Sequence, residues 1–100
     1  MNAKQSIGKS LKAFRISKGF AQSELESDPG HISGLENARR PLTAEKLENI
    51  AQILGVHPLS ILLKGYLLDD ERVTLEGLFQ QIRHEIESLS EASARKSPLR

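Results

Sequence analysis

The most informative segment of this sequence is Asp28-Pro29-Gly30-His31-Ile32-Ser33-Gly34-Leu35-Glu36-Asn37-Ala38-Arg39-Arg40. The segment predicts a short helix. Asp28 is a good N-cap because its carboxylate can accept hydrogen bonds from the first free amides, and Pro29 fits the first helical position, where no amide is needed. Ile32 and Leu35 are three residues apart, so they share one face and can anchor the helix to a core.

Two interpretations of this segment remain open when it is considered alone. A helix start attracts anions, of which phosphate is the commonest large one, and Arg39-Arg40 follows within reach of the same surface. The alternative is a surface helix with an ordinary cap and two solvated arginines. The surrounding chain is needed to separate these interpretations.

Length and composition exclude several classes of protein. The 100 residues predict one domain, and a hydrophobic content of 38% allows a modest core. The absence of cysteine excludes disulfides and thiolate metal sites. His31, His57 and His84 are far apart without metal-ligand spacing, and no glycine-rich phosphate loop or nucleophile motif occurs. We therefore expect no enzyme activity, metal or cofactor. The chain also lacks a signal peptide or membrane-length apolar run, so we expect a soluble cytoplasmic protein.

The charge is distributed unevenly although the formal net charge is only +1. Residues 1–20 carry five basic side chains and no acid, whereas residues 21–38 carry four acids and no lysine or arginine. A local basic patch can steer a domain toward nucleic acid because the field is short-ranged. Two solvated faces without a partner are the alternative interpretation.

Helical periodicity predicts the elements on both sides of the central segment. We expect residues 2–5 to form a frayed arm and Ser6 to cap a helix over Ile7–Lys18, which ends at Gly19. A short helix over Gln22–Ser27 then precedes the helix over Asp28–Asn37. After Pro41, Thr43 is expected to cap an amphipathic helix that ends at Gly55.

The C-terminal half predicts two further helices. A short helix begins near Pro58 and stops at Gly65, and Tyr66–Leu68 is expected to act as a hinge. A longer helix then runs from Asp69 or Asp70 to about Leu89, with acids at its start that suit the helix dipole. The composition of residues 90–100 predicts a disordered tail. No strand pattern is convincing, so the predicted fold class is all-α.

The order and spacing of these elements resemble the lambda repressor/Cro-like (XRE-type) helix-turn-helix family. The resemblance covers about residues 6–63. It depends on an ordered set of positions: Ile7-Gly8, Leu11-Lys12, Arg15, Lys18-Gly19, Gln22, Leu25, Ile32-Ser33, Leu35-Glu36-Asn37, Arg40-Pro41, Leu47, Ile50-Ala51 and Leu54-Gly55-Val56. It implies a five-helix lambda-repressor-like DNA-binding domain over residues 6–65, followed by the C-terminal helix of residues 66–89.

The resemblance also implies roles for particular residues. The helix over Asp28–Asn37 would enter the major groove of duplex DNA. Gln22 would bond a phosphate and brace that helix, and Arg15 and Glu36 would form a structural ion pair. The DNA-binding residues implied in this way are Gln22, Ser23, Pro29, Gly30, His31, Ser33, Gly34, Asn37, Arg39 and Arg40. Of these, Asn37, Arg39 and Arg40 match positions that hold the phosphate backbone.

Three features depart from the family pattern. The span from Gln22 to Ile32 is about four residues short, and Ala21 replaces the usual Ser or Thr cap. Pro29, Gly30 and Gly34 occupy base-facing positions but cannot form bidentate bonds to base edges. We therefore expect affinity to come mainly from phosphate contacts, with base readout by His31, Ser33 and, as further candidates, the two arginines.

The predicted function is a sequence-specific transcriptional regulator that binds a palindromic operator in double-stranded DNA as a homodimer. The C-terminal helix would supply the dimer contact through an apolar stripe of Leu75, Leu78, Phe79, Ile82, Ile86 and Leu89. Alternatively, this helix folds back on its own domain. A second hypothesis is an antitoxin or other protein-interaction module that uses the same fold and binds a protein partner through this helix.

Overall fold

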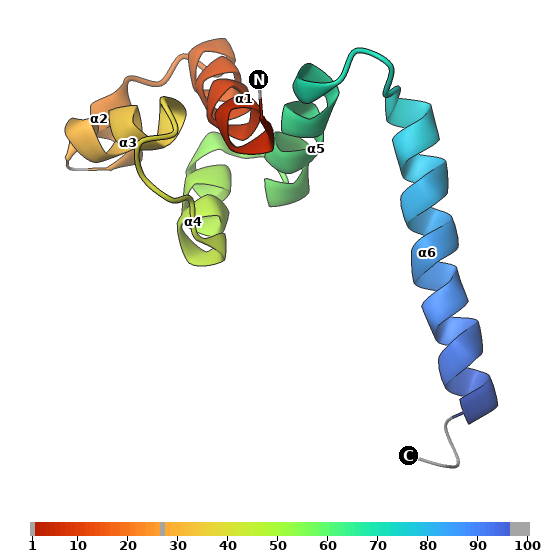
Figure 1. Ribbon diagram of the computed structural model, residues 1–100. Coiled ribbons are helices and arrows are strands. Elements are labelled where there is room, and N and C mark those ends of the chain that lie inside the picture. Colours follow the sequence, from red (N-terminus) through yellow and green to blue (C-terminus); the bar gives the residue numbers. More distant parts are fainter. Residues whose placement is uncertain (1, 27, 97–100) are drawn as a thin grey trace.

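A computed structural model describes residues 2–26 and 28–96 of the chain. Within these residues the fold consists of helices without strands, which confirms the predicted all-α class. Figure 1 shows the helices along the chain: α1 (Ala3–Ser17), α2 (Gln22–Leu25), α3 (Pro29–Glu36), α4 (Ala44–Leu54), α5 (Pro58–Asp69) and α6 (Leu75–Lys96).

The first five helices form a body around one apolar core. Helix α1 lies at its centre and packs mainly against α5 and also against α3, while α2 packs against α3 and α4 against α5. The buried apolar residues come from all five helices, and half-buried side chains such as Phe14 and Phe20 close the edges. The core residues are Leu11, Leu25, Ile32, Leu35, Leu47, Ile50, Ala51, Leu54 and Ile61.

The N-terminal residues are helical, so the expected frayed arm is wrong. Helix α1 begins at Ala3 because Asn2 and Gln5 form a capping box. The Asn2 side chain accepts a hydrogen bond from the Gln5 amide at 2.9 Å, and the Gln5 side chain accepts one from the Asn2 amide at 3.3 Å. Ser6, which was expected to be the cap, is fully buried instead.

Several helix ends lie where local signals predict them. Asp28 caps α3 and Thr43 caps α4, each through a side-chain bond to a first-turn amide. Gly55 ends α4 in the left-handed conformation at φ 74°. Helix α2 ends at Leu25, before the expected Ser27, which lies outside the described residues.

Helix α5 continues through Gly65, so neither the expected stop nor the hinge at Tyr66–Leu68 exists. Gly65 is buried where α5 crosses α1. A Cβ at this position would lie 2.9 Å from the Ile7 Cα and 2.6 Å from its Cγ1. The glycine therefore permits close packing of two helices and does not end one.

The break between α5 and α6 lies at residues 70–74. Hydrogen bonds from Arg72 to Asp70 hold this connection and lower the pKa of the Asp70 carboxyl. Thr74 accepts a hydrogen bond from the Gly77 amide, so α6 begins at Leu75 and not at Asp69 or Asp70. Helix α6 also extends to Lys96, so residues 90–96 of the expected disordered tail are helical, and residues 97–100 lie outside the described part.

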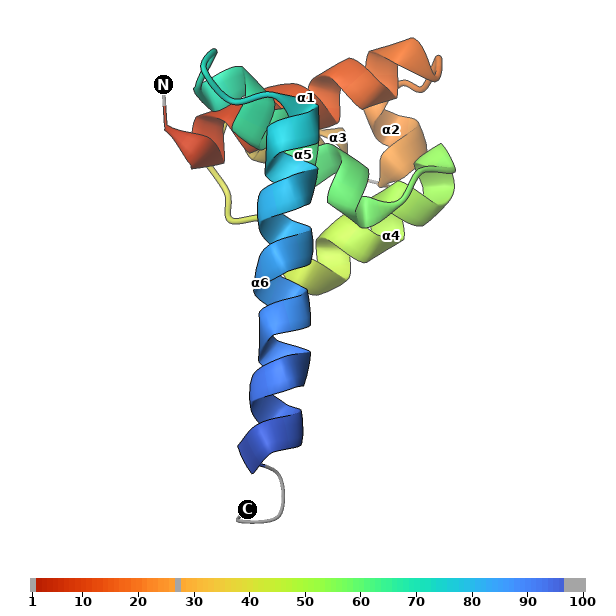
Figure 2. The same cartoon turned by 90° about the vertical axis from the view of Figure 1, so that its right-hand side faces the viewer.

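Helix α6 projects away from the body, as Figures 1 and 2 both show. The molecule measures 50 × 32 × 23 Å and has a radius of gyration of 16.5 Å, whereas a compact domain of this length has about 13 Å. Within residues 2–26 and 28–96, α6 makes no extensive contact with the other helices. Four of its apolar side chains are exposed, from 42% for Leu75 and 46% for Phe79 to 59% for Ile86 and 68% for Leu89, whereas Leu78 and Ile82 are half-buried.

Candidate nucleic-acid interface

Helices α2 and α3 form a helix-turn-helix pair at one edge of the body (Figure 1). Only residues 26–28 separate them. Ile32 and Leu35 are buried against the core, as the three-residue spacing predicts. The opposite face of α3 presents Gly30 and, half-buried, His31 and Ser33. This outer face is the candidate interface.

A buried ion pair fixes α3 against α1. The Arg15 Nε donates to Glu36 Oε2 at 2.6 Å, and its Nη2 donates to Oε1 at 3.2 Å. Gln22 of α2 donates to the same Oε1 at 3.1 Å, so one carboxylate joins three helices. The hydrogen bond to Glu36 raises the pKa of Arg15, although burial opposes this. The pair that the resemblance implies is thus present, with Gln22 as a further member.

The start of α3 is capped by a carboxylate. Asp28 Oδ1 accepts a hydrogen bond from the Gly30 amide at 3.0 Å, and Pro29 occupies the first helical position. The anion site expected at this helix start is therefore partly occupied by the side chain of Asp28. Positive charge is instead found at the opposite end of α3.

Arg39 and Arg40 follow the C-terminal end of α3 and turn back along it. The Arg39 Nη2 lies 3.4 Å from the Ser33 hydroxyl, and Asn37 donates to the same hydroxyl at 3.3 Å. Arg40 Nη1 lies 3.4 Å from Nδ1 of His31. Both guanidinium groups therefore lie beside the outer face of the helix.

The conformation of the C-terminal end of α3 directs the chain back along the helix. The Arg39 amide donates to the Gly34 carbonyl at 2.8 Å and the Ala38 amide to the Leu35 carbonyl at 3.2 Å, which is the Schellman pattern. Ala38 stands at the left-handed position with φ 59°, where glycine is usual. The chain then leads Arg40 back across the helix.

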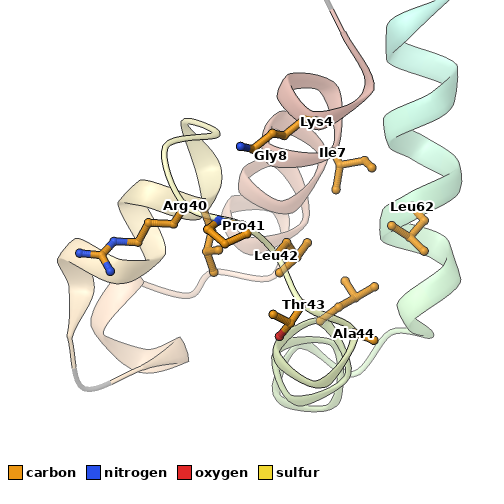
Figure 3. Close-up of a pocket in the computed structure, with 11 residues that line it drawn as sticks. Lys4, Ile7, Gly8, Arg40, Pro41, Leu42, Thr43, Ala44 and Leu62 are labelled. Atoms are coloured by element: carbon orange, nitrogen blue, oxygen red, sulfur yellow. The ribbon is translucent and has the colours of Figure 1, made fainter.

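Gly34 differs from the expectation of an open, base-facing position. The residue is buried, and a Cβ there would lie 2.8 Å from both Cγ and Cδ of Arg40. The aliphatic part of Arg40 therefore covers Gly34. Figure 3 shows the Arg40 side chain pointing toward α3 and away from the other residues of an apolar groove of about 630 Å³, which also includes Ile7, Leu42 and Leu62.

The acidic side chains near α3 are largely occupied. Glu36 is buried in its ion pair. Glu26 Oε1 pairs with Lys46 Nζ at 3.1 Å, and its Oε2 lies 3.9 Å from Nε2 of His31. The pairs with Arg15 and Lys46 limit the repulsion that an approaching phosphate would meet.

Two lysines of α1 extend the basic rim, and the residue-level prediction omitted them. Lys9 and Lys12 line a groove together with Gln5, Glu36 and Asn37. The three-residue spacing of the lysines places them on one helix face, but only the packing of α1 beside the end of α3 brings that face to the site. The rim therefore comprises Lys9, Lys12, Arg39 and Arg40.

Residues 2–26 and 28–96 contain no group of three or more His, Cys, Asp or Glu side chains that could hold a metal ion. No single helix in this part of the chain is long and apolar enough to cross a membrane, although α4 and α5 together reach the required length and composition with a bend of 104°.

The fold and the site define a small all-helical domain with a helix-turn-helix pair at its edge. No protein-family model and no curated protein matches this chain. Among solved structures, the chain is similar to the clp gene regulator ClgR from C. glutamicum, with 25% sequence identity and a TM-score of 0.63. The similarity covers 75% of this chain and 97% of the ClgR chain.

Proposed function

We propose that this protein is a sequence-specific DNA-binding transcriptional regulator of the lambda repressor/Cro-like type. The observation that carries the proposal is the outer face of α3, which is braced by the Arg15–Glu36–Gln22 network and flanked by a rim of four cations. The similarity to a gene regulator supports it. Helix α3 would lie in the major groove, and the cytoplasmic location expected from the sequence follows from this role.

In this proposal, phosphates contact the two ends of the basic rim. Lys9 and Lys12 would contact one stretch of backbone, and Arg39 would contact another beside Ser33 and Asn37. Gln22 is engaged with Glu36, so its role toward DNA would be to brace α3. Ser23 is exposed at the start of α2 and remains a candidate phosphate contact.

We further propose that the regulator is a homodimer joined through α6. Leu75, Phe79, Ile82, Ile86 and Leu89 alternate at spacings of four and three residues, which is the pattern of a two-helix seam. Because this seam has no extensive partner among the residues that the structure describes, a second α6 would bury it. Each copy would place its α3 in one half-site of a palindrome. The two half-sites would lie about one turn of the DNA helix apart.

The same exposed seam favours a second candidate, an antitoxin or other interaction module in which α6 binds a different protein. The two candidates predict different oligomeric states for the purified protein. Self-association through α6 favours the homodimeric regulator, whereas a monomer that gains a partner from its host through α6 favours the interaction module. DNA binding is compatible with both.

Salt-dependent binding to random duplex DNA tests the regulator. We expect log affinity to fall linearly with log salt, and Arg39→Ala to flatten the slope by about one unit on every sequence. Lys64→Ala is a matched control because Lys64 lies on α5 near Phe14, away from α3. The absence of binding at low salt would exclude the regulator.

A further inference from the structure

We infer that Arg40 is the main base-reading side chain of this protein and that it recognises guanine in the major groove. The inference rests on the proposed function and specifies it further. The sequence pattern placed Arg40 among the phosphate contacts, with base contact as a further possibility. The geometry around Gly34 favours base contact.

The outer face of α3 lacks long donors of its own. Gly30 is exposed and has no side chain, and Gly34 also has none. The stem of Arg40 lies over Gly34 so closely that a Cβ would be 2.8 Å from Cγ and Cδ and 3.1 Å from Nε. Arg40 therefore supplies a side chain at a helix position that has no side chain of its own.

The position of the Arg40 guanidinium is held by contacts on both sides. The Arg40 amide donates to the Gly34 carbonyl at 3.1 Å, which fixes the start of the side chain. At the other end, Nη1 lies 3.4 Å from His31 Nδ1. Since a guanidinium can only donate, His31 Nδ1 is the acceptor in this contact.

Charged side chains lie on the other side of His31. His31 Nε2 faces Glu26 Oε2 at 3.9 Å, and Glu26 Oε1 pairs with Lys46 of α4 at 3.1 Å. His31 thus acts as a positioning residue for Arg40. An arginine held in this way loses little side-chain freedom on binding, and its fork of donors matches O6 and N7 of guanine.

The test begins with the full chain and a pool of random duplexes. Duplexes selected by the wild-type protein are expected to share a guanine in each half-site. Replacing that guanine with deazaguanine, which lacks the N7 acceptor, should weaken wild-type binding by about 5- to 150-fold. Arg40→Ala should bind both duplexes equally, and Arg40→Lys should lose most of the preference although it retains the charge.

Two further variants separate base reading from phosphate contact. Gly34→Ala should reduce the preference for guanine because the new Cβ displaces the Arg40 stem. Arg39→Ala should lower the affinity for the guanine duplex and for the deazaguanine duplex by the same factor. The preference for guanine should therefore remain. Circular dichroism of each variant checks that α3 remains folded.

The outcomes distinguish the inference from the proposed function. The inference would be overturned if Arg40→Ala lowered the affinity for all duplexes equally and the variant still bound the deazaguanine duplex more weakly than the guanine duplex. Salt-dependent binding would then still support the regulator. A wild-type chain that binds no duplex at low salt would overturn both. Loss of the guanine preference in Arg40→Ala and Gly34→Ala, but not in Arg39→Ala, would support the role of Arg40.

Discussion

At the scale of single residues, Ala38 determines where the chain leaves α3. It is the one residue other than glycine with a positive φ in the described part of the chain. Its left-handed conformation aligns Arg39 and Arg40 with the outer face of the helix. A side chain in this conformation costs about 1–2 kcal/mol, and glycine would avoid the cost.

We therefore expect Ala38→Gly to raise the free energy of unfolding by about 0.5–1 kcal/mol, because the relief of strain exceeds the added entropy of the unfolded chain. Urea denaturation measures this difference. Ala13→Gly is the control, since Ala13 is an exposed residue inside α1, and it should lower the stability by about 1 kcal/mol. A decrease in both variants would contradict the assigned role of Ala38.

The Arg15–Glu36 pair gives a second prediction at this scale. The side chain of Glu36 is only 2% exposed, so Arg15→Met would leave a buried carboxylate with Gln22 as its remaining side-chain partner. We expect the unfolding free energy to fall by about 3–5 kcal/mol. The double variant Arg15→Met/Glu36→Leu should recover much of this loss, because it removes the stranded charge.

Single residues could be predicted from the sequence where a family pattern or a local rule applied. The resemblance implied the Arg15–Glu36 pair, and cap preferences identified Asp28. The cover that Arg40 provides over Gly34 was beyond such rules, because it depends on the left-handed turn at Ala38 and on side-chain direction. The contribution of Lys9 and Lys12 likewise required the packing of α1 beside α3.

At the scale of helices, the sequence signals predicted that each helix exists better than they predicted where it begins and ends. Both ends of α4 were predicted correctly, because Thr43 and Gly55 cap the helix through contacts within one helical turn. Gly65 was misinterpreted as a stop because its role is set by Ile7, which is distant in the sequence. The acids at residues 69–71 resemble a helix start, but Thr74 provides the cap of α6.

The crossing of α1 and α5 provides the test at this scale. If Gly65 ended a helix, alanine would have little effect on packing. Because a Cβ would meet the Ile7 backbone at 2.9 Å, we expect Gly65→Ala to lower the unfolding free energy by about 1–3 kcal/mol. Thermal or urea denaturation measures the change, and an unchanged or increased stability would show that the helices do not approach so closely.

At the scale of the whole molecule, the body and α6 present two separate surfaces. The body presents α3 with its basic rim, and α6 presents an exposed apolar seam. Their separation lets one surface be changed without the other. The sequence predicted the seam from its spacing, but the independence of α6 from the body is a property of the folded chain.

We expect the chain to sediment at twice its mass of 11.1 kDa. Phe79→Glu should shift the population to monomer, because it places a charge in the apolar seam. Gln80→Glu adds the same charge beside the seam and should leave the dimer intact. A wild-type monomer in sedimentation equilibrium would exclude the homodimer, and the seam would then be assigned to a different protein partner.

The most direct test of the DNA-binding surface is the change in amide chemical shifts of the labelled protein during titration with a selected duplex. We predict that the largest changes fall in residues 30–40 and around Lys9 and Lys12, and that α5 is little affected. Changes that cluster on α5 or α6 and leave α3 undisturbed would contradict the assignment of α3 as the surface that binds DNA.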